Sequence, residues 1–136
     1  MTSKKIDEYK KINIQIAENL DPYKTVSVLL KNAQDKIQIA RNALKDNDIA
    51  TKGKNISVAI LTVEALQSVL NLEKGEEVAA NLFKLYQYMI ETLLMANLHS
   101  SDEKLAEVYL LMENVKEGWD GIHEYAEKLM REKSAK

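Results

Sequence analysis

Residues 70–98 read LNLEKGEEVAANLFKLYQYMIETLLMANL, and this stretch decides the fold. Carboxylates at Glu73, Glu76 and Glu77 favour the start of a helix, and Gly75 allows a turn just before the apolar residues begin. The pattern therefore predicts a long helix that begins near Gly75. Its apolar residues fill one face and the flank beside it, and a stripe this broad needs cover on two sides. They are Val78, Leu82, Phe83, Leu85, Tyr86, Met89, Ile90, Leu93 and Leu94.

Two segments before this helix repeat apolar residues at three- and four-residue spacing, which is typical of helices. Asp21 and Pro22 provide an N-cap and a first helical residue for a helix that should end near Lys45. The polar cluster at residues 46–48 breaks it. The helix that follows is apolar nearly all round, because Glu64 is the only charged residue between positions 56 and 72.

The chain after residue 98 predicts one more helix. The helix that begins near Gly75 should end near His99, and a Ser100-Ser101 cap then starts a fourth helix with a seam from Leu105 to Leu129. Connections of only a few residues make consecutive helices antiparallel neighbours. The first helix is basic and the last acidic, so these two should lie side by side. The predicted fold is all-α, an antiparallel up-down-up-down four-helix bundle.

Composition agrees with this fold and excludes several classes of protein. A chain of 136 residues suits one domain, and four Gly and one Pro favour an all-α chain. The absence of Cys removes disulfides and thiolate sites and fits a reducing compartment. The start MTSKKIDEYKK is too charged for a signal peptide, and no apolar run is long enough to insert in a membrane. We therefore expect a cytoplasmic protein, whose net charge of -2 gives no attraction to nucleic acid.

Residues 1–20 differ from the rest of the chain. Ile6 and Tyr9 are spaced as on a helical turn, whereas the isoleucines at positions 12, 14 and 16 alternate with polar residues as in a strand. We interpret this leader as a mobile N-terminal arm that lies extended over an apolar groove. A short extra helix, docked permanently, is the alternative. The bundle domain should then comprise residues 21–132, followed by a disordered tail at 133–136.

One pattern within residues 70–90 resembles the flagellar secretion chaperone family FliS. The pattern is L-x-x-E-K-G-x-E-x-A-x-N-L-x-x-L-Y-x-Y-M-I, and it spans a helix start and the turns that follow. The continuation through residues 93–98 and the tryptophan at position 119 are also similar to the family. The residues that fill the pattern are Leu70, Glu73, Lys74, Gly75, Glu77, Ala79, Asn81, Leu82, Leu85, Tyr86, Tyr88, Met89 and Ile90.

The resemblance implies a cytosolic bundle that binds the C-terminal segment of flagellin, prevents its early polymerisation and presents it to the flagellar export gate. A client that is unfolded before it binds needs a partner with exposed apolar surface. The helices at residues 56–72 and 78–98 carry more apolar residues than one buried face requires, so they could provide that surface. Ile6 and Tyr9 match by spacing the family's N-terminal Ile and Tyr, which are implicated in export-gate docking and in capping the groove. The residues that we expect to form the flagellin-binding groove are Ile60, Leu61, Phe83, Tyr86, Tyr88, Ile90 and Leu94.

Two segments depart from the usual family pattern. A Leu-aromatic-acidic-Gly run is replaced by Leu29, Leu30, Lys31 and Asn32, and the usual Gly-Gly is Gly75-Glu76. These changes leave the expected fold intact, and a chaperone for a divergent or second flagellin would explain them.

The sequence offers no set of residues for catalysis, for a cofactor or for a metal site. A di-metal bundle needs two Glu-x-x-His motifs, and neither His99 nor His123 follows a Glu at that spacing. We therefore predict a protein that is not an enzyme. Two alternatives to the chaperone stay open: a histidine phosphotransfer module that uses His123, and a structural homodimeric bundle in which the surplus apolar faces meet.

Overall fold

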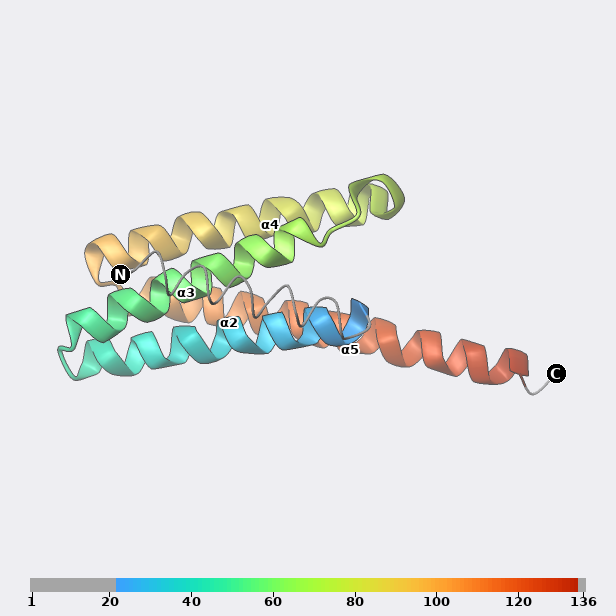
Figure 1. Cartoon of the computed structure of the whole chain (residues 1–136), viewed down its shortest axis with the longest axis horizontal. Coiled ribbons are helices and arrows are strands. Elements are labelled where there is room, and N and C mark those ends of the chain that lie inside the picture. The colour runs from blue at the N-terminus through green and yellow to red at the C-terminus, as the bar shows by residue number, and fades with distance from the viewer. Residues whose placement is uncertain (1–21, 135–136) are drawn as a thin grey trace.

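A computed structural model describes residues 22–134 of the chain, and these form four helices in a ring (Figure 1). The helices are α2 (Pro22–Lys45), α3 (Ile49–Ser68), α4 (Leu72–His99) and α5 (Asp102–Ser134). Consecutive helices run antiparallel, and α2 also packs against α5, which closes the ring. The predicted all-α, up-down-up-down four-helix bundle is confirmed. The predicted arm with Ile6 and Tyr9 lies outside the described residues, so the division into arm, bundle and tail stays a prediction.

Local capping explains why the helices begin where they do. The Asp48 carboxylate accepts a 3.1 Å hydrogen bond from the backbone N–H of Thr51 at the start of α3. Hydrogen bonds from the Thr51 side chain and then from its backbone lower the pKa of Asp48. The Ser101 hydroxyl accepts a 3.2 Å bond from the N–H of Lys104 at the start of α5. The helix ends predicted from the sequence are confirmed for α2, for the start of α5 and for the end of α4.

The beginning of α4 is not a regular helix. The residues from Leu72 to Gly75 form one turn, and the chain then kinks at Glu76, where φ is 49° and ψ is -127°. This backbone region favours glycine, so a glutamate there is strained. A Cβ atom on Gly75 would collide with the Ala79 side chain, which explains the glycine at this corner. The continuous part of α4 therefore starts about one turn after Leu72.

Charged and polar side chains join α2 to α5, as their opposite charges predicted. The Arg41 guanidinium lies 2.8 Å from Asp102, which holds the pKa of that carboxyl below its usual range and raises that of the arginine. Further along, the Gln34 amide donates a 2.6 Å hydrogen bond to Glu113. The interior between all four helices is filled by apolar side chains with little or no exposure. The largest are Leu30, Ile37, Ile56, Leu66, Met89, Leu93, Leu105 and Met112.

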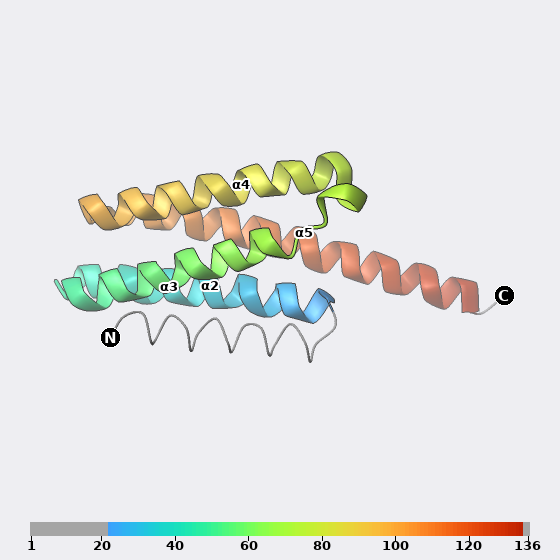
Figure 2. The same ribbon diagram turned by 45° about the horizontal axis from the view of Figure 1, so that its top comes forward.

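The last helix extends past the bundle. Figures 1 and 2 show α5 continuing beyond the end at which α2 begins and α3 connects to α4. Leu105, Val108 and Met112 are fully buried, as the predicted seam requires, whereas Ile122 is 64% and Leu129 is 40% exposed. The prediction that this seam is covered as far as residue 129 was wrong, because the other helices end before it. We call residues 122–134 the α5 overhang.

Candidate functional site

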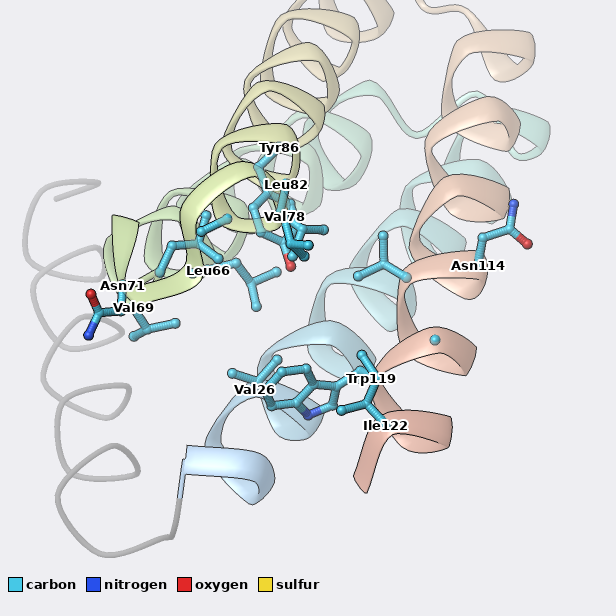
Figure 3. Close-up of a pocket in the computed structure, with 15 residues that line it drawn as sticks. Val26, Leu66, Val69, Asn71, Val78, Leu82, Tyr86, Asn114, Trp119 and Ile122 are labelled. Carbon is cyan, nitrogen blue, oxygen red and sulfur yellow. The ribbon is translucent and has the colours of Figure 1, made fainter. Parts of the chain in front are cut away.

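An apolar cleft of about 540 Å³ opens at the end of the bundle where α5 leaves it (Figure 3). All four helices contribute to its walls. We call it the end cleft. Its large side chains include Val26 of α2, Leu66 of α3, Leu82 and Tyr86 of α4, and Trp119 and Ile122 of α5.

The kink in α4 helps to form the end cleft. Gly75 and Ala79, which meet at this corner, both line the cleft, as does Val78 in the first turn after the kink. On the opposite wall Gly118 presents bare backbone, since a Cβ atom there would meet nothing within 4 Å. Both glycines therefore line a hollow that lies where α4 and α5 separate at this end, which Figure 3 shows.

Tyr86 forms the inner part of the wall on α4. Its side chain is 2% exposed, and burial raises the pKa of its phenol to about 12. The ring therefore stays neutral and contributes an apolar surface at any physiological pH.

Trp119 forms the opposite wall and is held by α2. Its indole N–H donates a 3.1 Å hydrogen bond to the backbone carbonyl of Tyr23, and the two rings stack with centroids 6.0 Å apart. Tyr23 in turn donates a 2.7 Å hydrogen bond to Asp120, which raises the pKa of the phenol, and stacks on His123 at 3.6 Å. Trp119 therefore ties α5 to the first turn of α2.

A smaller hollow of about 180 Å³ adjoins the end cleft along α5. It is lined by Tyr23, His123 and Ala126, and it shares Trp119 and Ile122 with the larger cleft. Apolar surface is thus continuous from the end cleft onto the α5 overhang.

The two tyrosines predicted for the groove point in different directions. Tyr86 lines the end cleft, whereas Tyr88 is 47% exposed and donates a 2.7 Å hydrogen bond to Glu107 of α5. Residues two apart on a helix are separated by a rotation of roughly 200° about its axis, so the two side chains point to nearly opposite sides. Of the seven predicted groove residues, Tyr86 is the one that lines the end cleft.

Four of the other predicted residues follow the line between α3 and α4. The Gln67 amide of α3 donates hydrogen bonds of 3.2 and 3.1 Å to the Phe83 carbonyl and to Gln87, which shows that this flank of α4 faces α3. Ile90 and Leu94 lie seven and eleven residues after Phe83 and so share its flank. We call this line the α3–α4 seam, and Ile60 lies on it because it precedes Gln67 by two turns.

Exposure differs among these seam residues. Leu94 is 54% and Phe83 is 40% exposed, Ile60 is half-buried, and Ile90 belongs to the buried core. Leu61 is also half-buried but lies roughly 100° further round α3. The seven predicted residues therefore do not form one groove.

The helical spacing of Val78, Leu82 and Trp119 fits a buried core seam as well as a cleft wall. The pattern alone does not show where the neighbouring helices end. The feature of the sequence that could have indicated the end cleft is a pair of glycines: Gly75 precedes the wall on α4, and Gly118 lies within the wall on α5.

Two further properties concern the described residues 22–134. None of their helices combines the length and apolarity that crossing a membrane requires. His123 is half-buried, with its ring on Tyr23 and its Nε2 atom 2.9 Å from Glu127. A phosphotransfer histidine must instead be open to a partner domain, so this setting argues against that alternative.

Comparison with known proteins then decides the family. The family model described as Flagellar protein FliS matches residues 3–126. The chain belongs to the FliS family. It is 34% identical to the flagellar secretion chaperone FliSB of Pseudomonas aeruginosa over 120 residues, which are 88% of this chain and 95% of that protein. It is also 34% identical to the flagellar secretion chaperone FliS of Salmonella typhimurium over 123 residues, 89% and 91% of the two chains.

A more distant relative extends the same picture. The flagellar secretion chaperone FliS of Vibrio cholerae is 27% identical over 118 residues, 86% of this chain and 87% of that one. FliS is a family of chaperones and not of enzymes, so membership supports a role in flagellar export. The resemblance seen in residues 70–90 is confirmed.

Proposed function

We propose that this FliS protein is a cytoplasmic export chaperone that binds the C-terminal segment of flagellin, prevents its premature polymerisation and delivers it to the flagellar export gate. One observation carries the proposal: a member of a secretion chaperone family has an open cleft of about 540 Å³ whose large lining side chains are apolar.

The physical match is between an apolar cleft and a client that folds as it binds. A segment that is disordered alone can form an amphipathic helix and bury its apolar side chains in a preformed groove. The end cleft is suited to that task because Tyr86 and Trp119 are held in place by burial and by the Tyr23 contacts. Fixed aromatic walls lower the entropy that binding costs.

The α3–α4 seam supplies a second stretch of apolar surface for the same client. Phe83 and Leu94 are exposed along it. An extended client chain that occupies the end cleft could continue along this seam.

The proposal is tested with the full chain and a peptide of the flagellin C-terminal segment. Val78 is 67% exposed and lines the end cleft, so Val78→Glu places a carboxylate there without opening the core. We expect it to weaken peptide binding about tenfold or more, because the peptide would have to desolvate that charge. Leu110→Glu is the matched control, since Leu110 is 63% exposed on α5 and does not line the cleft.

Size-exclusion chromatography and circular dichroism measure the outcome. The parent chain and Leu110→Glu should form a stoichiometric complex with a gain of helix, and Val78→Glu should not. Phe83→Glu tests the α3–α4 seam in the same assay. If Val78→Glu binds like the parent chain while Phe83→Glu does not, the client uses the seam and the assignment of the end cleft is wrong.

Delivery is tested separately through the arm residues that the family resemblance suggests. Ile6→Ala and Tyr9→Ala should leave peptide binding intact and lower the secretion of flagellin in cells that carry the variant. If both variants secrete flagellin normally, these two residues do not act in docking to the export gate.

A further inference from the structure

The walls of the end cleft carry few polar side-chain groups, and most of these do not face its interior. The lining residues with a nitrogen or oxygen in the side chain are Asn71, Tyr86, Asn114 and Trp119. The Trp119 indole N–H is already bonded to the Tyr23 carbonyl. Figure 3 shows the amide groups of Asn71 and Asn114 directed away from the hollow. The Tyr86 phenol is therefore the polar group that is left for an occupant of the cleft.

Tyr86 is buried, yet its hydroxyl has no partner within the described part of the chain. The side chain is 2% exposed and lines the cleft, and Figure 3 shows it pointing from α4 toward the hollow. No hydrogen bond joins its phenol to another residue in the range 22–134. A buried hydroxyl is nearly always paired in a folded protein, because leaving it unpaired costs free energy. The free chain therefore bears a cost that a bound partner would remove.

The surroundings of the phenol make a hydrogen bond there selective. Burial raises the pKa of Tyr86 to about 12, so the oxygen keeps its proton at physiological pH and can both donate and accept a hydrogen bond. Apolar side chains, among them Leu66 and Leu82, line the cleft around it. An occupant that leaves this hydroxyl unpaired, or that buries its own polar group elsewhere in the cleft, binds less tightly.

The chemistry of the cleft restricts the group that can pair with the phenol. A client helix pairs its backbone N–H and C=O groups internally except near its ends, so along its length it offers side chains. An ionised side chain would lose more hydration in an apolar cleft than one hydrogen bond restores. An uncharged amide or hydroxyl therefore matches the neutral phenol best.

We propose that Tyr86 is a specificity-determining residue of the end cleft, whose phenol forms a hydrogen bond with one uncharged polar side chain, an amide or a hydroxyl, of the bound client helix. Apolar client residues three or four positions to either side of that residue then contact the walls that Leu82 and Trp119 provide. The inference rests on the proposed function and adds a sequence rule to it: the client places a single amide or hydroxyl within an apolar helical face.

One substitution removes the hydroxyl and keeps the ring. Full-length Tyr86→Phe is titrated with a peptide of the flagellin C-terminal segment. We expect the affinity to fall roughly tenfold to hundredfold, because the polar group of the peptide would be buried without a partner. Tyr125→Phe is the matched control, since it makes the same change at a tyrosine that is 65% exposed and lies outside the cleft. It should bind the peptide like the parent chain.

Thermal unfolding distinguishes recognition from a structural role. The Tyr86 hydroxyl has no partner to lose among the described residues, and it faces an open cleft, so its removal breaks no bond there and leaves no internal void. The Tm of free Tyr86→Phe near neutral pH should therefore equal or exceed that of the parent. A lower Tm together with weaker binding would assign the phenol a structural role and overturn the proposal.

Variants of the peptide identify the polar residue of the client. Each Asn, Gln, Ser and Thr of the peptide is replaced in turn by an apolar residue of similar size. One replacement should weaken binding to the parent about tenfold or more and leave binding to Tyr86→Phe almost unchanged, because its partner is already absent there. If no replacement shows this coupling, the phenol recognises no client side chain and the proposal is wrong.

The parent chain separates this proposal from the proposed function. If the parent does not bind the flagellin peptide, the proposed function fails and this inference fails with it. If the parent binds the peptide and Tyr86→Phe binds it equally tightly, the proposed function stands and this inference alone fails.

Discussion

The indole N–H of Trp119 donates a hydrogen bond of 3.1 Å to the backbone carbonyl of Tyr23, and this bond ties the middle of α5 to the first turn of α2. The same two residues stack, and Tyr23 also stacks on His123. One wall of the end cleft is therefore fixed by the start of the helix that opens the bundle.

Removing this bond should loosen that end of the molecule. Trp119→Phe keeps an aromatic ring but loses the N–H donor and part of the packing, so we expect the free energy of unfolding to fall by about 1–2 kcal/mol. Hydrogen exchange should accelerate in the first turns of α2 and not at the turn between α2 and α3. Unchanged exchange near Tyr23 would show that other contacts hold α2 in place.

The close approach of Gly75 and Ala79 predicts a rescue by a second substitution. Gly75→Ala adds a methyl group that would collide with Ala79, so we expect a loss of about 1–3 kcal/mol. Ala79→Gly removes the opposing methyl group and costs about 1 kcal/mol through helix propensity and packing. In thermal unfolding the double variant should be more stable than the sum of the two single changes. Strict additivity would contradict the contact.

The backbone at Glu76 predicts that one glycine substitution stabilises the chain. Glu76 has a positive φ of 49°, where glycine is unstrained. Glu76→Gly should therefore raise the free energy of unfolding by about 1 kcal/mol, or roughly 4 °C in Tm for a chain of this size. Glu77→Gly is the matched control in regular helix and should destabilise. A loss of stability in Glu76→Gly would show that the glutamate side chain contributes more than the strain costs.

Burial of Tyr86 predicts an alkaline limit to stability. Its pKa is raised from 10.0 to about 12 in the folded chain, so the unfolded chain loses the proton first as pH rises. The stabilisation is complete below pH 10 and is lost between pH 10 and about 12. Tyr86→Phe should flatten this part of the stability curve in denaturant titrations, whereas Tyr125→Phe, which removes an exposed ring, should not. An equal alkaline decline in Tyr86→Phe and in the parent would contradict the assignment.

The parts of the fold that depend on local chemistry were predictable from the sequence. Pro22, Asp48 and Ser101 start helices through their own backbone preferences and caps, and these signals lie within a few residues. The basic residues of the first helix and the acidic residues of the last also predicted that these two helices are neighbours. The ion pair between Arg41 and Asp102 confirms it.

The end cleft was not predictable in the same way, because it depends on where helices end relative to one another. Leu82 and Trp119 follow the core period, and their exposure to a cleft arises from the kink at Glu76 and from the length of α5. The periodicity likewise could not show that Ile90 is buried while Leu94, four residues later on the same flank, is open to solvent.

The fluorescence of Trp119 tests the central claim most directly. It is the one tryptophan of the chain, and it forms a wall of the end cleft. If the flagellin C-terminal segment binds in the end cleft, titration with a tryptophan-free peptide of that segment should shift the emission to shorter wavelength and saturate at one peptide per chain. A complex that forms on size-exclusion chromatography while the emission of Trp119 stays unchanged would contradict the account.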